Sequence, residues 1–361
     1  MKKIFLFLFA IFAGLVLAGA GCFSFTDEKE TVTTGPAGMF VSGNKGDSWQ
    51  SISVWPDVDG LKSLSDVSVY RLIDDPQDPN AIYWASRNNG LLFSYNEGRS
   101  WQKAAAPLDS GFVYGAAVHP KKKCEIFATN GFQIYKSEDC ARSWENVYQE
   151  DRSDARISSM RFDPSGEHTL FITKINGDLL FSNDEGVSWS ILYRFGVDIG
   201  RIEPDSVRPN TWYLASRGNG LYRSDDGGKN WINLGAVLQQ YPGAVEYRNM
   251  VIHPAKQDTL YWISTYGILK SVDRGDSWIP YKLITSPGSV DIYGFAVNPD
   301  DDKEMYYAAM RDERSTFYKT NDGGQTWSTK KLPSGQYPVV MRAHPNKKDI
   351  IYVGFAKPLS N

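Results

Sequence analysis

The sequence predicts an all-β protein that folds as a single seven-bladed β-propeller of four-stranded blades. One observation is a motif close to S-x-[DN]-x-G-x-[ST]-W that occurs seven times, with successive tryptophans 52, 43, 45, 42, 47 and 49 residues apart. Another is that short runs of alternating apolar and polar residues fill the intervals, whereas no long segment has a 3.6-residue period. Repeats of this length indicate one supersecondary unit, most often a propeller blade. The motif copies are residues 42–49, 94–101, 137–144, 182–189, 224–231, 271–278 and 320–327.

Every repeat contains four elements in the same order. An apolar first strand ends in a turn before proline, as in residues 116–120 and 294–299, and a β-branched and aromatic second strand follows. A short loop, usually with glycine, leads to the third strand, which runs into the motif. The motif tryptophan begins the fourth strand. The predicted second strands are residues 81–85, 125–128, 169–173, 211–215, 259–263, 304–308 and 350–354.

The two ends of the chain are predicted to share one blade. Residues 38–42 form a third strand and lead into a motif, but no first or second strand precedes them. The missing pair is found at residues 339–343 and 350–355. Joining these segments closes the ring and leaves only short blade edges. The propeller is therefore expected to run from residue 36 to residue 357.

The motif is interpreted as a structural turn. Its Asp or Asn can accept backbone N–H groups, its glycine permits a backbone conformation that other residues resist, and its tryptophan packs between layers. Calcium binding or acid catalysis by the carboxylates is the alternative. Asn44 and Asn96 occupy the acidic position in two copies. An amide replaces neither a catalytic acid nor a charged ligand set, which favours the structural role.

The N-terminus has the pattern of an export signal. Lys2 and Lys3 precede an apolar run at residues 4–17, and small residues at 18–21 precede Cys22. This ending resembles a bacterial lipoprotein signal, although Gly19 stands where that pattern favours leucine. The resemblance implies a signal peptide at residues 1–21, a lipidated Cys22 and a polar tether at residues 22–35. The protein is then expected to be an exported lipoprotein, anchored to the membrane on its extracytoplasmic side.

Cleavage after Ala20, which leaves Cys22 as a free thiol, is the alternative. Two further cysteines lie in one repeat, Cys124 at the start of its second strand and Cys140 within its motif turn. In an up-and-down blade these turns lie at the same end, and an exported context permits a disulfide. The bond is expected to contribute about 3 kcal/mol in the chain-entropy model. Ala141, which replaces the motif glycine, stands beside it.

Basic residues gather at one end of the predicted propeller, although the chain without residues 1–21 has 37 Lys and Arg against 42 Asp and Glu, a formal charge of −5. Five of seven equivalent positions past the second strands are basic, at the end opposite the motifs. The starts of the first strands open at this end and add Arg71, Arg201 and Arg248. Arginine can hold carboxylate, sulfate or phosphate groups in a forked geometry, so these residues predict a site for an anionic protein segment or glycan. The seven positions are Arg87, Asn130, Lys174, Arg217, Tyr266, Arg311 and Lys357.

The sequence gives little indication of a metal site, a cofactor site or nucleic-acid binding. His119, His253 and His344 occupy the turn after a first strand, where other repeats carry Asp, Arg or Asn, and His168 lies in a loop. None has a metal-ligand spacing to Cys or Asp, so neither a metal nor a cofactor is expected. Tyr266 could stack on a sugar or a peptide. The negative charge and the export signal argue against nucleic-acid binding.

Carboxyl groups at the same end leave an enzymatic alternative. Asp66, Asp198, Asp291 and Glu246 all precede first strands. Glycoside hydrolysis needs two carboxyl groups about 5–10 Å apart. Asp66, Asp291 and Glu246 are the catalytic candidates under this alternative.

The motif copies resemble the Asp-box or BNR repeats of sialidases, sortilin-type receptors, xyloglucanase-type glycoside hydrolases and photosystem II assembly-factor propellers. Residues 214–228, LASRGNGLYRSDDGG, are especially similar to the last three groups. Sialidases have six blades, sortilin-type receptors have ten, and xyloglucanase-type enzymes hold substrate between two propellers. A single exported seven-bladed propeller is most similar to the assembly-factor group. The resemblance implies a non-enzymatic binding or assembly module, with a glycoside hydrolase as the alternative.

Overall fold

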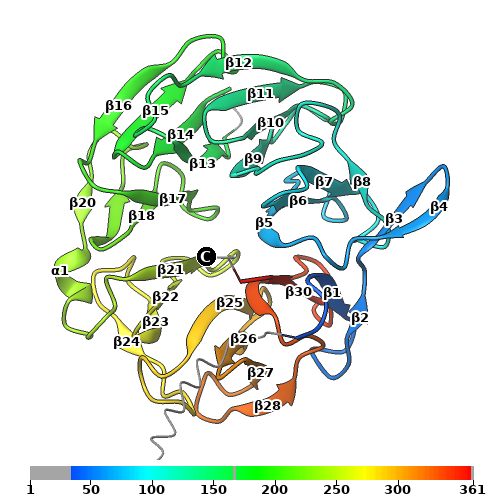
Figure 1. Cartoon of the computed structure of the whole chain (residues 1–361). Coiled ribbons are helices and arrows are strands. Elements are labelled where there is room, and N and C mark those ends of the chain that lie inside the picture. The colour runs from blue at the N-terminus through cyan, green and yellow to red at the C-terminus, as the bar shows by residue number, and fades with distance from the viewer. Residues whose placement is uncertain (1–33, 166–167, 359–361) are drawn as a thin grey trace, which may run out of the picture. The chain divides into compact units, whose positions relative to one another are not determined.

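The computed structural model describes residues 34–165 and 168–358, and its four-stranded sheets form one propeller (Figure 1). Seven antiparallel four-stranded sheets surround a central axis, which confirms the predicted fold class. We number the sheets as blades 1–7 and name each from its first strand, next to the axis, to its fourth strand at the rim.

Blades 1–4 have the following strands. Blade 1 contains β5 (Val69–Asp74), β6 (Ile82–Ser86), β7 (Leu91–Ser94) and β8 (Gln102–Lys103). Blade 2 contains β9 (Gly115–Val118), β10 (Ile126–Thr129), β11 (Gln133–Ser137) and β12 (Glu145–Gln149). Blade 3 contains β13 (Ile157–Phe162), β14 (Leu170–Lys174), β15 (Asp178–Ser182) and β16 (Ser190–Arg194). Blade 4 contains β17 (Ile199–Pro204), β18 (Trp212–Ser216), β19 (Gly220–Ser224) and β20 (Ile232–Asn233).

Blades 5–7 complete the ring. Blade 5 contains β21 (Tyr247–Ile252), β22 (Leu260–Ser264), β23 (Gly267–Ser271) and β24 (Ile279–Pro280). Blade 6 contains β25 (Asp291–Asn298), β26 (Asp301–Arg311), β27 (Arg314–Thr320) and β28 (Ser328–Lys331). Blade 7 contains β29 (Tyr337–Ala343), β30 (Ile351–Ala356), β1 (Gly38–Ser42) and β2 (Gln50–Ser51). Two elements were not predicted: the hairpin of β3 (Val54–Asp57) and β4 (Gly60–Ser63), and the short helix α1 (Gly235–Leu238).

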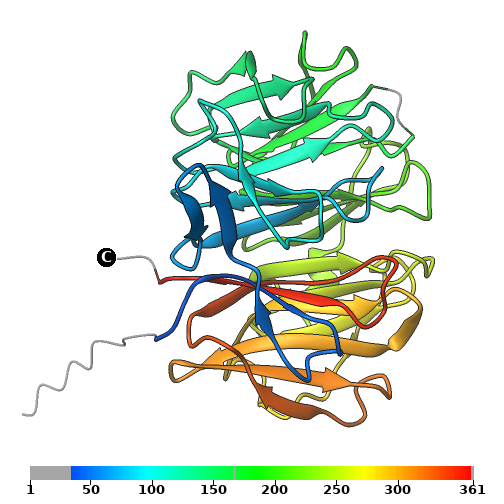
Figure 2. The same cartoon turned by 90° about the vertical axis from the view of Figure 1, so that its right-hand side faces the viewer.

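Blade 7 is built from both ends of the propeller, as predicted. Strand β1 pairs antiparallel with β30 from Gly38 opposite Phe355 to Ser42 opposite Ile351. In both views the two strands lie side by side (Figures 1 and 2). We call the end of the propeller that carries the loops between second and third strands the loop end, and the opposite end the motif end.

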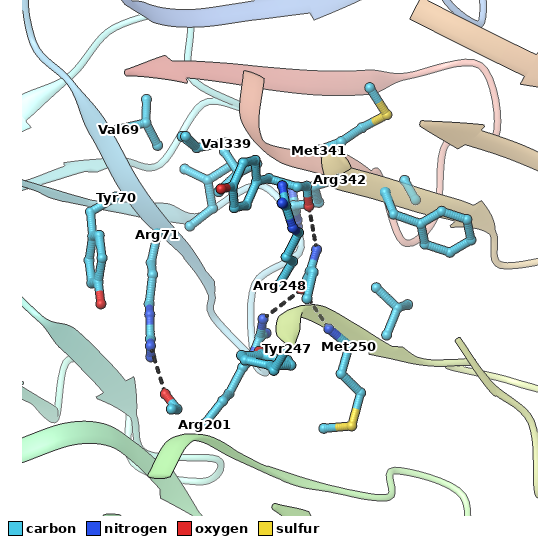
Figure 3. Close-up of a pocket in the computed structure, with 18 of the residues that line it drawn as sticks. Val69, Tyr70, Arg71, Arg201, Tyr247, Arg248, Met250, Val339, Met341 and Arg342 are labelled. Atoms are coloured by element: carbon cyan, nitrogen blue, oxygen red, sulfur yellow. Dashed lines mark hydrogen bonds between the residues drawn. The ribbon is translucent and has the colours of Figure 1, made fainter. Parts of the chain in front are cut away.

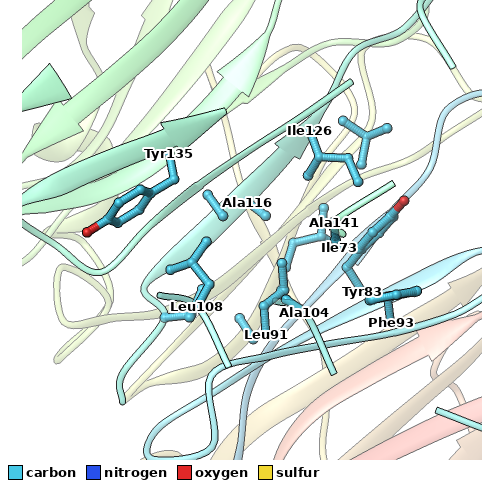
Figure 4. Close-up of a cluster of buried hydrophobic side chains, with 14 residues drawn as sticks. Ile73, Tyr83, Leu91, Phe93, Ala104, Leu108, Ala116, Ile126, Tyr135 and Ala141 are labelled. Atoms are coloured by element: carbon cyan, nitrogen blue, oxygen red, sulfur yellow. The ribbon is translucent and has the colours of Figure 1, made fainter. Parts of the chain in front are cut away.

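The hydrophobic core lies between neighbouring blades. One cluster joins Tyr83 and Leu91 of blade 1 to Ala116 and Ile126 of blade 2 (Figure 4). Further clusters of the same kind occur around the ring, and Trp84 is among the side chains that are fully buried. Burying one large apolar side chain stabilises the fold by about 1.5–3 kcal/mol. The repeated apolar strands therefore hold the blades against one another.

The motif turns use their polar groups internally. In the first copy Ser42 Oγ donates to Asn44 Oδ1, which accepts the backbone N–H of Ser48 at 2.9 Å. The backbone N–H of Gly46 donates to Ser42 Oγ, and a Cβ on Gly46 would lie 2.3 Å from the Phe317 ring. The same pattern recurs around the ring. The motif side chains are thus engaged in turn formation.

Cys124 and Cys140 form a disulfide, with their Cα atoms 4.2 Å apart. It joins the turn before β10 to the motif turn of the same blade. Cys22 and the expected signal and tether, residues 1–33, lie outside the described residues. No helix within the described part of the chain is long and apolar enough to cross a membrane.

Candidate functional site

The first strands of five blades enclose a pocket of about 710 Å³ on the propeller axis (Figure 3). Strands β5, β17, β21, β25 and β29 contribute most of its lining, and β13 contributes Arg161. In a propeller, the side chains of the first strands that face the axis converge, although the residues are far apart in sequence. The lining includes apolar residues, tyrosines and an unusual number of arginines. Five of these, which we call the central arginines, are Arg71, Arg161, Arg201, Arg248 and Arg342.

Glu203 on β17 neutralises part of the positive charge of the central arginines. Arg161 Nε and Nη2 donate to its two carboxylate oxygens at 2.8 and 2.6 Å, and Arg201 Nε donates to Oε1. Burial alone raises the pKa of a carboxyl group, but the charges of Arg161 and Arg201 outweigh it and lower the pKa of Glu203 to about 2. Glu203 is therefore ionised and bridges blades 3 and 4.

Arg201 and Arg248 continue the connections around the axis. Arg201 Nη1 donates to Asn249 Oδ1 at 3.1 Å, and Asn249 Nδ2 donates to the carbonyl oxygen of Tyr293 at 2.9 Å. Arg248 contacts the carboxylate of Asp291 and lies over the Tyr293 ring, 4.8 Å from its centre. These contacts join blades 4, 5 and 6 at the pocket wall.

Arg71 and Arg342 have fewer partners. Arg71 Nη2 donates to the carbonyl oxygen of Gly200 at 3.0 Å, while its buried Nη1 has no hydrogen-bond partner among the described residues. Burial, together with the positive charges of Arg201 and Arg161, lowers the pKa of Arg71. Arg342 Nε contacts Asp74 without hydrogen-bond geometry, and no guanidinium nitrogen of Arg342 has a hydrogen-bond partner in the described chain.

The predicted basic residues separate into two groups. Arg71, Arg201 and Arg248 line the pocket, as do Arg87 and Arg217 nearer the loop end. Three other predicted site residues do not line it. Lys174 is only 5% exposed and contacts Glu150 and Tyr148 inside the fold. Arg311 pairs with Asp312 at 3.4 Å outside the pocket. Tyr266 packs on Tyr241 beside a smaller cavity of about 340 Å³.

The carboxyl groups of the enzymatic alternative lie around the loop end. Asp66 contacts Lys357 at 2.8 Å, Asp198 contacts Arg217 at 3.1 Å, and Asp291 contacts Arg248. Glu246 is exposed and immediately precedes pocket-lining Tyr247. None of these four carboxyl residues is itself part of the pocket lining within residues 34–165 and 168–358.

Three of the four histidines take part in turns, whereas His168 contacts Glu185. His119 Nδ1 accepts the backbone N–H groups of Lys121 and Lys122 at 3.0 and 2.9 Å, and burial lowers its pKa. A neutral imidazole that accepts at Nδ1 carries its proton on Nε2, which cannot then bind a metal. His119, His168 and Glu185 cluster within 4.8 Å, but Lys122 also contacts Glu185. His253 and His344 accept backbone N–H groups in the same way.

Sequence reasoning missed Arg161, Glu203 and Arg342. All three stand two residues before the turn residue that ends a first strand, where blades 1, 2, 5 and 6 have Ile73, Ala117, Val251 and Ala296. A charged residue at a position that is apolar in the other repeats was the available signal.

No protein-family model matches the chain. Its sequence is similar to a probable oligoxyloglucan-reducing end-specific xyloglucanase of Neosartorya fischeri, with 25% identity over 283 residues that cover 70% of this chain and 33% of the relative. A xyloglucanase of a Paenibacillus species is also similar. The chain spans 33% of the length of the first relative and 23% of the length of the second.

Two solved structures have the same fold. The GH74 enzyme of Niastella koreensis superposes with a TM-score of 0.62 and 15% identity, covering 80% of this chain and 51% of its own. YCF48 from Cyanidioschyzon merolae superposes with a TM-score of 0.59 and 13% identity, covering 80% of this chain and 95% of its own. These likenesses support the propeller fold.

The predicted absence of enzymatic activity is contradicted by these relatives. The similar sequences are xyloglucanases, which favours the glycoside hydrolase alternative over a non-enzymatic binding or assembly module. The prediction treated a single propeller as evidence against this group. The match to about half of the GH74 enzyme shows that one propeller can correspond to part of such a protein.

Proposed function

We propose that the protein is a glycoside hydrolase that acts on a polysaccharide bound at the loop end of the central pocket. The observation that carries this proposal is a pocket of about 710 Å³ at the centre of a propeller whose similar sequences are xyloglucanases. Tyr70 and Tyr247 line the pocket and offer aromatic surface to the C–H groups of a sugar. A concave site with a few convergent polar groups suits a ligand of this size.

Glu246 and Asp291 are the proposed pair of catalytic carboxyl groups. They precede or begin the first strands of neighbouring blades, β21 and β25, at the loop end. Arg248, two residues after Glu246, contacts Asp291. One group would protonate the glycosidic oxygen and the other would act as base or nucleophile. Asp66, near blade 7, is the third candidate.

The test is the release of new reducing ends by the purified protein from xyloglucan, from other β-glucans and from polysaccharides that carry uronic acid or sulfate esters. We expect activity to fall by about 10²-fold or more in Glu246→Gln and in Asp291→Asn, because general acid–base catalysis contributes this much. Asp312→Asn is the matched control, since Asp312 is exposed and lies outside the pocket. Absence of cleavage by the parent protein, or full activity in both variants, would overturn the proposal.

Export and lipid anchoring at Cys22 are part of the same proposal. A polysaccharide substrate outside the cytoplasm would be accessible to an exported enzyme. The supporting pattern is the basic, apolar and small-residue order of residues 1–21 before Cys22.

A further inference from the structure

We infer that the central arginines bind an acidic group of the glycan, so that the substrate carries a uronic acid or a sulfate ester. This inference rests on the proposed glycoside hydrolase function and specifies its substrate class. The ligand chemistry is an oxyanion attached to a sugar, placed within reach of Arg71 and Arg342.

The charge within the pocket wall is the first argument. Five guanidinium groups meet three carboxylates: Glu203 contacts Arg161 and Arg201, Asp291 contacts Arg248, and Asp74 contacts Arg342. Arg71 contacts no carboxylate among the described residues. The central arginines therefore exceed the carboxylates that contact them by two charges. Burying charge without an opposite charge is unfavourable, and a bound anion would relieve the excess.

The second argument is the supply of free donors. Nη1 of Arg71 and Nη1 and Nη2 of Arg342 are buried without a hydrogen-bond partner in the described chain. Buried polar groups in folded proteins almost always have partners, and donors left unmet by the protein at a pocket can bind a ligand, an ion or water. A carboxylate or sulfate accepts hydrogen bonds and matches the planar fork of a guanidinium.

The residue type is the third argument. Seven of the eight basic residues that line the pocket are arginine, which stays protonated even in a buried site, whereas lysine readily loses its proton there. The pocket wall therefore keeps its positive charge over the physiological pH range. Tyrosine rings in the same pocket favour a sugar as the carrier of the anion.

The experiment measures binding by calorimetry with a matched set of oligosaccharides. One contains uronic acid, the second is its carboxyl-reduced counterpart, and the third carries sulfate esters on the same backbone. We expect the parent protein to bind an acidic member about tenfold or more tightly than the reduced one, since a charge-assisted hydrogen bond is worth about 1.4 kcal/mol or more. The arm that binds more tightly, uronate or sulfate, identifies the anion.

Variants test whether the central arginines cause this preference. Arg71→Gln and Arg342→Gln should each reduce the preference for the acidic oligosaccharide over its reduced counterpart about tenfold. Arg311→Gln is the matched control, because Arg311 lies outside the pocket. Thermal unfolding of each variant establishes that it is folded. If both variants unfold, the salt dependence of binding to the parent replaces them: acidic binding must weaken with salt while neutral binding does not.

Three results would overturn the inference: equal binding of the acidic and reduced oligosaccharides, an acidic preference that survives in both folded variants, or tighter binding of an acidic peptide than of any oligosaccharide. The outcome is separable from that of the proposed function. Cleavage of neutral xyloglucan without an acidic preference would contradict only this inference, whereas a retained acidic preference without cleavage of any glycan would contradict only the hydrolase.

Discussion

Arg71 on β5 donates a hydrogen bond to the carbonyl oxygen of Gly200 on β17 at 3.0 Å, across 129 residues of sequence. These strands belong to blades 1 and 4, which are as far apart around the ring as two of seven blades can be. The Arg71 side chain therefore extends from β5 to β17 and links two blades that are not neighbours (Figure 3).

Replacing Glu203 by Gln should destabilise the protein by about 3 kcal/mol, because it leaves two partly buried guanidinium groups without their carboxylate. Glu203 is 16% exposed and contacts both Arg161 and Arg201. Urea denaturation measures the loss. The exposed Asp47→Asn serves as a control and should change stability by about 0.5 kcal/mol or less. A loss below about 1 kcal/mol for Glu203→Gln would contradict the bridging role.

The pH dependence of stability should include an acid limb from the motif turns. The Ser188 hydroxyl and backbone N–H groups hold the pKa of Asp184 at about 2, and the Ser143 and Thr326 groups do the same for Asp139 and Asp322. The folded pKa lies below the ordinary value of 3.8, so the stabilisation is complete above pH 3.8 and is lost as pH falls toward 2.

Thermal unfolding between pH 6 and pH 2 checks this expectation. A variant with Asn at positions 139, 184 and 322 should show a shallower acid limb. Asn44 provides the precedent, since its Oδ1 accepts the backbone N–H of Ser48 at 2.9 Å in the same turn geometry. An unchanged acid limb in this variant would assign the acid sensitivity to other carboxyl groups.

Gly90→Ala should destabilise blade 1 by about 1–3 kcal/mol. Gly90 has φ +73°, and a Cβ there would lie 2.2 Å from the carbonyl oxygen of Leu108. Gly43→Ala is a suitable comparison, since a Cβ there meets nothing within 4 Å. Equal unfolding midpoints for the two variants would show that the loop between β6 and β7 adjusts freely.

Loss of the Cys124–Cys140 disulfide should cost about 3 kcal/mol, because the bond limits the conformations of the unfolded chain. The variant in which both cysteines become serine is compared with the parent in urea, with and without a reductant. Reductant should destabilise the parent and have no effect on the variant. A parent that is equally stable with the disulfide reduced would contradict the expected contribution.

Cys22→Ala should release the protein from the membrane fraction if Cys22 carries the lipid anchor. Metabolic labelling with a radioactive fatty acid should mark the parent and not the variant. A labelled variant, or an unlabelled parent in the soluble fraction, would favour ordinary signal cleavage. The matched control is Cys124→Ser, which should keep the label.

The fold was predictable because its signals are local and repeated. Each motif closes a turn within eight residues. In the first copy, for example, the hydrogen bonds join Ser42 to Asn44 and Asn44 to Ser48. The spacing of the tryptophans then determines the repeat. Blade 7 followed from the same pattern because its missing strands occur once more at residues 339–355.

The site was only partly predictable because its contacts join distant repeats. Lys174 is the last residue of β14, and the sequence predicted that it would be exposed at the loop end. Glu150 from the neighbouring blade pairs with it inside the fold instead. Arg161 and Arg342 lie within apolar strands, and only the convergence of the first strands on the axis brings them together. The spacing of residues in the sequence indicates neither the Lys174–Glu150 pair nor the approach of Arg161 to Arg342.

The shared blade has a mechanical consequence. Strand β1 is held between β2 and β30, with five residue pairs to β30 and two to β2. A pull on the segment before Gly38 acts along this strand, and the rungs of an antiparallel ladder lie perpendicular to the strand. Such a force shears all the rungs together instead of peeling them singly. The pairs to β30 and to β2 would therefore resist such a force together, which makes this shared blade a firm point of attachment for the ring.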